Sequence, residues 1–253
     1  MNQLIVFGTA VMFLTRLPVG RYASGDPQVL TQSVRYFPLV GLIVALIMSG
    51  VLTVSIMILP LNVALASAVL AGILSTGAFH EDGLADVADS AGAFDVISKL
   101  KIMRDSQVGT YGSLALVLCV LLRFLLLWEL ATAGIALAVA ALILAHANSR
   151  WSSVYLMARV DYARPEAANR VVAAGVENRI LFQATLCLLV VMVIPATVLT
   201  SWVFVVIPCT WLATIACAHY FKSAFSGITG DCLGAANIVV ELVCLALVLA
   251  SLR

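Results

Sequence analysis

Long apolar runs are the feature that most constrains how this chain can fold. Seven stretches are long enough for a helix to cross the hydrocarbon of a bilayer, which takes about 20 apolar residues: 36–59, 61–79, 111–129, 131–148, 181–200, 202–221 and 233–252. The chain is 63% hydrophobic and only 11% charged, whereas an ordinary soluble domain is roughly 45–50% apolar and about 25% charged. We therefore predict an all-α, polytopic integral membrane bundle of about seven transmembrane helices.

An eighth apolar segment, 3–19, is interrupted by Arg16 and Pro18. The sequence leaves open whether this segment spans the membrane, re-enters it or lies in the interface. It lacks the basic start and the small-residue cleavage site of a signal peptide, so we do not expect it to be cleaved. The net charge of +1 argues against a nucleic-acid partner. The six scattered cysteines form no C-x-x-C pair and suggest neither a zinc site nor a disulfide framework.

The basic residues predict which connections share one side of the membrane. If the seven helices alternate, segments 20–35, 80–110, 149–180 and 222–232 lie on the same side. These segments hold most of the basic residues: Arg21, Arg35, Lys99, Lys101, Arg104, Arg150, Arg159, Arg164, Arg170, Arg179 and Lys222. The connections on the opposite side carry no Lys or Arg except the terminal Arg253. By the positive-inside rule the four segments face the cytoplasm.

An acidic run, FHEDGLADVADS (79–90), closes the second predicted span. On a helix, Asp82, Asp86 and Asp89 fall within an arc of about 60°, while Glu81 points about 100° away from Asp82 and reaches the group only from its edge. Carboxylates gathered this closely repel one another unless a cation lies between them. Mg²⁺ prefers such oxygen ligands and commonly bridges to substrate phosphates. The alternative is a solvated helix end, although Gly83 argues against a purely helix-building role and suggests a close approach by a ligand or helix.

Three further groups of residues beside or within the predicted spans are candidates for a functional role. Gly109 and Gly112 precede the third span, where free backbone amides can hold a phosphate, although glycines are also ordinary helix flanks. Asp231 lies in a glycine-rich entrance to the last span and is either a simple N-cap or part of a site. Arg123 and Glu241 lie within spans, and an ionisable residue at that depth is a functional-site hypothesis by default.

Six segments together resemble the cobalamin synthase family, also called adenosylcobinamide-GDP ribazoletransferases: FLTRLPVG (13–20), FHEDGLADVADS (79–90), IMRDSQVGTYG (102–112), NSRW (148–151), YAR (162–164) and GITGDCLGAA (227–236). The resemblance covers nearly the whole chain in order, and D-G-L-A-D-x-x-D and T-G-D-x-L-G-A are quite specific. This chain has Ser90 and Ser226 where the family usually has glycine, and Glu81 is not a fixed family position.

The resemblance implies one membrane-embedded catalytic domain over residues 1–253, in the bacterial inner membrane. It implies Mg²⁺-dependent joining of adenosylcobinamide-GDP with α-ribazole or its 5′-phosphate to give adenosylcobalamin, or its 5′-phosphate, and GMP. The expected metal ligands are Asp82, Asp86, Asp89, Glu81 and Asp231, with Asp82, Asp86 and Asp89 as the catalytic group and Asp89 alternatively a base. The expected substrate-binding residues are Arg104, Asp105, Arg150, Arg164, Gly230 and Asp231. A homo-oligomer is compatible with this expectation.

Three alternatives to this function are weighed for a chain of this kind. A transporter would have a similar number of spans, but transporters bind substrate near the midplane and carry internal repeats, whereas here the carboxylates cluster at one interface. A phospholipid-forming CDP-alcohol phosphotransferase has a distantly similar acidic motif. A non-catalytic scaffold gives no reason for three aspartates on one face.

Overall fold

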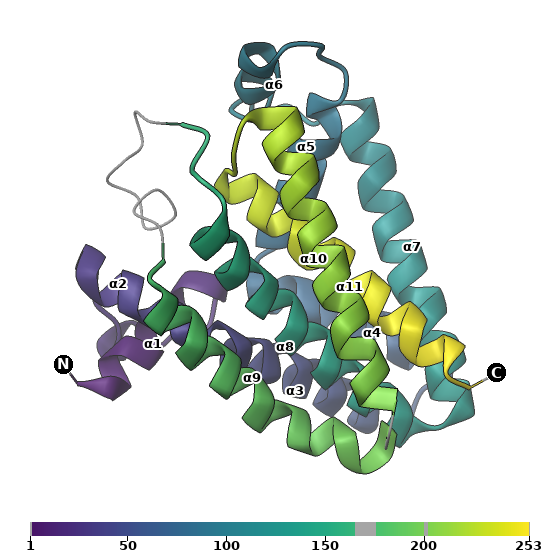
Figure 1. Cartoon of the computed structure of the whole chain (residues 1–253). Coiled ribbons are helices and arrows are strands. Elements are labelled where there is room, and N and C mark those ends of the chain that lie inside the picture. The colour runs from purple at the N-terminus through teal and green to yellow at the C-terminus, as the bar shows by residue number, and fades with distance from the viewer. Residues whose placement is uncertain (1, 165–175, 200–201, 253) are drawn as a thin grey trace.

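The computed structural model describes residues 2–164, 176–199 and 202–252, and within them the chain is helical, with a single isolated β-bridge (Figure 1). In chain order the helices are α1 (Gln3–Leu14), α2 (Pro27–Ser33), α3 (Phe37–Ser55), α4 (Leu61–Thr76), α5 (Phe79–Ser90), α6 (Val96–Ile102), α7 (Thr110–Ala133), α8 (Ile135–Arg159), α9 (Asn178–Leu199), α10 (Val203–Phe225) and α11 (Gly230–Ala250), with 3₁₀ turns η1 (Gly20–Tyr22) and η2 (Val34–Tyr36).

The number of spans agrees with the sequence prediction. Among the described residues, six helical segments are long and apolar enough to cross a membrane, and the bent pair α4–α5 makes a seventh if it counts as one span. The chain is therefore a helical integral membrane protein. Helix α1 has 12 residues and is about 18 Å long, so it is too short to cross a hydrocarbon core of about 30 Å.

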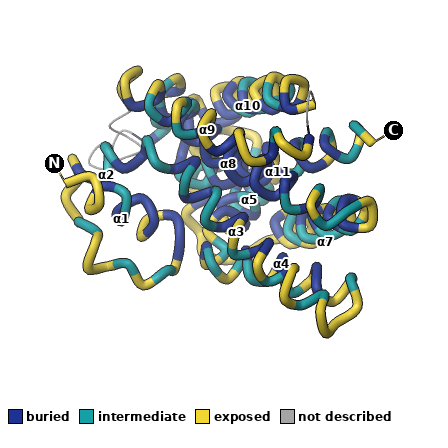
Figure 2. Tube along the Cα trace, turned by 90° about the horizontal axis from the view of Figure 1, so that it is seen from below, coloured by how far each residue is buried: buried dark blue, intermediate teal, exposed yellow. Residues whose placement is uncertain are grey.

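The centre of the bundle is formed by α8 and α11, and Figure 2 shows buried residues concentrated there. The most apolar window of α8 is 78% buried and that of α11 is 67% buried, against 28% for the outer helices α7 and α10. Small residues permit this close packing. A Cβ on Gly41 of α3 would lie 2.3 Å from the backbone oxygen of His146, so α3 and α8 touch through their backbones.

Helix α8 extends further than the sequence predicts. The predicted span ended at residue 148 and placed 149–159 in a cytoplasmic loop, but the helix runs on to Arg159. The two serines of this last part bind the backbone of α8 itself: Ser149 Oγ donates to the His146 oxygen at 3.0 Å, and Ser152 Oγ donates to the Ser149 oxygen at 2.6 Å. Counting apolar residues did not predict this part of α8, because its residues are polar and yet buried.

The chain turns sharply between α4 and α5. Gly77 (φ 67°) and Ala78 (φ 58°) both adopt the left-handed conformation, and the Ala78 N–H donates to the Ile73 oxygen at 3.0 Å, which closes the end of α4. The two helices meet at 86°. The acidic run is therefore a separate helix of the bundle and not the frayed end of the second span.

The polar segments that were predicted to share one side lie close together. A parallel bridge joins Tyr162 to Ile228, and Arg164 Nη2 donates to the Leu100 oxygen at 3.3 Å. Arg35 Nη1 donates to Gln183 Oε1 at 3.1 Å, which links the segment before α3 to the start of α9. One end of the bundle thus gathers the charged connections.

Candidate active site

Helix α5 carries the acidic run and packs against α11 through two glycines. A Cβ on Gly83 would lie 2.7 Å from the backbone oxygen of Asp231, and a Cβ on Gly234 would lie 3.2 Å from the His80 oxygen. Only glycine permits so close an approach at position 83, and a Cβ at position 234 would be a tight contact. The close approach that Gly83 suggested is therefore made by a helix, and it brings Asp231 next to the acidic run.

Three carboxylates lie together where α5 and α11 meet. Asp82 is exposed and Asp86 is half-buried, while the Asp231 side chain is 24% exposed. Asp86 experiences the negative charges of Asp231, Asp82 and Asp89 and the positive charge of Arg164. We call Asp82, Asp86 and Asp231 the carboxylate patch. Its like charges favour the binding of a cation.

Asp89 lies at the end of this helix face and binds the start of α7. Its Oδ2 accepts from the Gly109 N–H at 2.7 Å and its Oδ1 accepts from the Gly112 N–H at 2.8 Å. A Cβ on Gly112 would lie 2.3 Å from Asp89 Oδ2, which explains the glycine. The amides that the sequence suggested for a phosphate are therefore occupied by a carboxylate of the same chain, a favourable partner for a helix N-terminus.

Arg164 reaches the carboxylate patch from the segment after α8. Ile228 N–H donates to the Asp161 oxygen and Ala163 N–H donates to the Ile228 oxygen, both at 2.9 Å. A Cβ on Gly227 would lie 2.5 Å from the Asp161 oxygen, so glycine is required for this pairing. The buried Arg164 then places Nη2 3.6 Å from Asp231 Oδ2.

The last helix begins at a threonine, not at the aspartate. Thr229 is the N-cap of α11 and its hydroxyl accepts from the Cys232 N–H at 3.3 Å. Asp231 lies in the first turn, where its Oδ2 accepts from the Thr229 hydroxyl at 3.2 Å. Ser226, the last residue before Gly227, adopts a left-handed conformation (φ 59°). The simple N-cap interpretation of Asp231 is therefore wrong.

The donor chemistry of the carboxylate patch fits Mg²⁺. Across residues 2–164, 176–199 and 202–252, no three His, Cys, Asp or Glu side chains already converge closely enough to hold a metal ion. Mg²⁺ commonly binds through only one or two carboxylates and completes its shell with water and substrate phosphates. Asp82 and Asp86, one helical turn apart and accessible from solvent, provide that minimal set.

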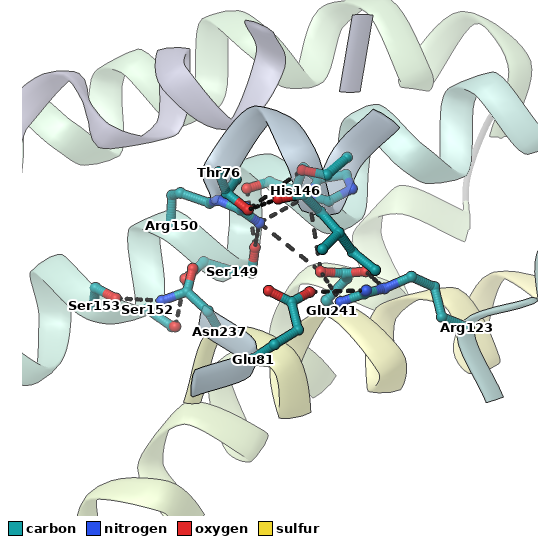
Figure 3. A network of polar contacts seen from close by, with 12 residues as sticks. Thr76, Glu81, Arg123, His146, Ser149, Arg150, Ser152, Ser153, Asn237 and Glu241 are labelled. Carbon is teal, nitrogen blue, oxygen red and sulfur yellow. Dashed lines mark hydrogen bonds and ion pairs between the residues drawn. The ribbon is translucent and has the colours of Figure 1, made fainter. Parts of the chain in front are cut away.

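Glu81 and Arg150 lie elsewhere than the sequence predicted (Figure 3). Glu81 accepts from Arg123 Nη1 at 2.9 Å, and Arg150 Nη1 lies 2.8 Å from His146 Nδ1 and donates to Ser149 Oγ at 2.8 Å. All these residues are buried in the bundle. Glu81 points about 100° away from Asp82 on α5, and Arg150 belongs to the unpredicted extension of α8. The structure therefore does not bring either residue to the carboxylate patch.

The remaining predicted site residues lie at the same end of the bundle. Arg104 and Asp105 are exposed after α6, and Asp105 Oδ1 accepts from the Gln107 N–H at 3.1 Å. Gly230 lines a cavity of about 50 Å³ together with Phe79, His80 and Asn237. Arg170, one of the predicted basic residues, lies outside the described part of the chain.

The sequence singled out Arg123 and Glu241 one by one but not their partners. Arg123 Nε donates to Glu241 Oε1 at 2.6 Å, which pairs the two intramembrane charges. Opposite charges inside two predicted spans were a usable signal for this pairing. The ion pair between Glu81 and Arg123 could not be predicted from the sequence, because it depends on the turn between α4 and α5.

Comparisons with known proteins match one family along nearly the whole chain. The family model for cobalamin-5-phosphate synthase matches residues 6–249. The chain is 37% identical to an adenosylcobinamide-GDP ribazoletransferase of Shewanella frigidimarina, over 99% of this chain and 96% of the relative. It is 36% identical to the protein of the same name in Shewanella woodyi, over 96% and 95%, and 38% identical to that of Shewanella amazonensis, over 96% and 94%. No solved structure matches the chain.

Proposed function

The chain belongs to the cobalamin-5-phosphate synthase family of transferases, and on that premise we propose that it joins adenosylcobinamide-GDP with α-ribazole or its 5′-phosphate. The products are adenosylcobalamin, or its 5′-phosphate, and GMP. The observation that carries the proposal is that Asp82, Asp86, Asp231 and Arg164 lie within electrostatic reach of one another where α5 meets α11. Such a patch suits a diphosphate that arrives with a divalent cation.

The reaction is a phosphoryl transfer. A ribose hydroxyl oxygen bonds to the phosphorus that carries the cobinamide, the bond from that phosphorus to the GMP oxygen breaks, and GMP leaves with the bonding electrons. Mg²⁺ bound at the patch would neutralise the negative charge of the diphosphate and of departing GMP. Asp82 and Asp86 hold the cation in this proposal, and Arg164 offers a guanidinium to the phosphates.

Asp89 and Asp231 have separate parts in the proposal. Both oxygens of Asp89 accept amide hydrogens at the start of α7, so we assign Asp89 to holding α7 beside the patch and not to accepting the hydroxyl proton. Asp231 orients Arg164 through their ion pair. Asp82 is exposed, so in this proposal solvent carries the hydroxyl proton to the phosphate of departing GMP or to buffer.

The activity is tested by following GMP release from adenosylcobinamide-GDP plus α-ribazole in detergent or proteoliposomes. We expect release with Mg²⁺ and none after chelation with EDTA, restored by added Mg²⁺. Release that is unaffected by EDTA would contradict the metal assignment. Flux of substrate across proteoliposomes without release of GMP would support a transporter. Turnover of CDP-diacylglycerol in place of adenosylcobinamide-GDP would support a phospholipid-forming enzyme.

We expect Arg164→Ala to raise KM for adenosylcobinamide-GDP about 10- to 100-fold with a smaller change in kcat. The reason is that a charge-assisted hydrogen bond to phosphate contributes about 1.5–3 kcal/mol. Arg159→Ala is a matched control, since Arg159 is exposed and donates to Asn178 Oδ1. Steady-state kinetics of both variants measure the effect. An unchanged KM in Arg164→Ala would show that this arginine serves only membrane orientation through the positive-inside rule.

We further propose that the chain lies in the bacterial inner membrane with the carboxylate patch facing the cytoplasm. The support is the basic composition of the segments gathered at that end of the bundle. Ser106→Cys, in the exposed loop before α7, should react with a membrane-impermeant maleimide in inverted vesicles and not in intact spheroplasts. The opposite pattern of labelling would reverse the orientation.

A further inference from the structure

Four charged side chains from four helices meet inside the bundle (Figure 3). Arg123 of α7 binds Glu81 of α5 at 2.9 Å and Glu241 of α11 at 2.6 Å. Arg150 of α8 places Nη1 3.9 Å from Glu241 Oε2. Two arginines and two glutamates make the group neutral, and we call these four residues the buried charge cluster.

The buried charge cluster is removed from solvent. Arg123 and Arg150 are each 3% exposed, Glu81 is 7% exposed and Glu241 is 1% exposed. A charge at this depth is costly unless it is paired. Removing one member leaves the others unbalanced, so each helix is held to a definite position by the charge that it contributes.

Two residues of the buried charge cluster and the neighbouring His146 have polar atoms without hydrogen-bond partners, and these residues line one small cavity. Glu81 Oε2, Arg150 Nε and His146 Nε2 are buried without a hydrogen-bond partner, and all three residues line a cavity of about 10 Å³. A cavity of this size holds about one water molecule. Since His146 Nδ1 faces an Arg150 donor, the neutral imidazole carries its proton on Nε2, so the three atoms are two donors and one acceptor.

Glu81 connects this cluster to the reaction site because it is the residue directly before Asp82. Neighbouring helical residues point about 100° apart, so fixing the direction of Glu81 fixes the directions of Asp82 and Asp86 on the same 12-residue helix. The turn at Gly77 and Ala78 separates α5 from α4. The ion pair to Arg123 therefore sets the rotation of α5 about its own axis.

We propose that Glu81 is a positioning residue, which aligns the carboxylates of α5 with the substrate through the buried ion pair with Arg123. This inference rests on the proposed phosphoryl transfer, and it goes beyond it by giving a catalytic consequence to a residue that touches neither substrate nor metal. The inference also explains why Glu81 is next to the carboxylate patch in sequence but points away from it.

The test compares Glu81→Gln, Glu81→Asp and the exposed control Glu129→Gln. We expect Glu81→Gln to lower kcat roughly 10- to 100-fold, because a shift of about 1 Å at the reacting groups has an effect of that size. The KM for each substrate should change less than threefold. The melting temperature should fall, because the substitution leaves an unpaired positive charge in the buried cluster, so kcat is measured per folded molecule below the melting transition. Glu81→Asp, which keeps the charge, should recover part of kcat.

The readouts separate positioning from ordinary structural support. If Glu81→Gln melts at a much lower temperature but keeps wild-type kcat per folded molecule, the residue is structural and the inference is overturned. Wild-type kcat with unchanged melting overturns it too. Failure of the wild type to release GMP would instead reject the proposed function itself. Glu129→Gln should match the wild type in every measurement.

Discussion

Asp82→Asn and Asp86→Asn should each reduce GMP release about 10³-fold or more, while both proteins still insert, purify and melt like the wild type. Each substitution removes a negative charge and keeps the side-chain shape. The loss falls on the step in which charge develops on the diphosphate and on departing GMP, where a fixed cation is most effective. Asp82 is exposed and Asp86 half-buried, so neither change leaves a hole in the apolar core.

Asp95→Asn is the matched control for these two variants. Asp95 is exposed and caps α6, where its Oδ1 accepts from the Ser98 N–H at 2.9 Å; this hydrogen bond lowers the pKa of Asp95. Asparagine caps a helix about as well as aspartate, so the variant should keep wild-type kinetics. Wild-type activity in either Asp82→Asn or Asp86→Asn would remove that residue from the metal assignment.

The second large effect is expected from a single methyl group. Gly83→Ala would place a Cβ 2.7 Å from the backbone oxygen of Asp231 and 3.0 Å from its Cα. Both are backbone atoms and cannot rotate away, so α5 and α11 have to separate. We expect a loss of about 1–3 kcal/mol in stability and a fall in kcat of more than about 100-fold, because Asp231 and the α5 carboxylates move apart.

Gly50→Ala provides the comparison, because nothing lies within 4 Å of the Cβ that it would add to α3. Alanine is the better helix former by about 0.5–1 kcal/mol, so this variant should be neutral or slightly more stable. Thermal melting in detergent and steady-state kinetics measure both variants. Gly83→Ala with normal melting and normal kcat would show that α5 and α11 do not need this contact for the reaction.

The spans could be predicted from sequence because a membrane sets a length and a composition that few other structures share. The six long helices and α4 fall on the predicted apolar runs. Helix α5 was expected in the cytoplasmic segment 80–110, but it packs into the bundle with His80, Glu81 and Gly83 buried. The end of α8 could not be predicted, because Ser149, Arg150 and Ser152 are polar and yet find their partners inside the bundle. Counting apolar residues cannot distinguish a buried polar turn from a loop.

The same limit applies to the candidate site. Helical spacing correctly separated Glu81 from Asp82, because direction on a helix follows from residue number. The partners could not be derived, since they depend on how distant helices pack. Asp89 meets Gly109 and Gly112 only because α5 runs toward the start of α7, and Glu81 meets Arg123 only in the folded bundle.

The central claim is that Asp82 and Asp86 hold a divalent cation against the diphosphate of the substrate. The most direct measurement is a high-resolution structure of the protein with adenosylcobinamide-GDP and Mg²⁺, without the second substrate. We predict a metal peak about 2.1 Å from an oxygen of Asp82, an oxygen of Asp86 and a phosphate oxygen. A nucleotide bound elsewhere in the bundle, with both aspartates directed into solvent, would contradict the claim.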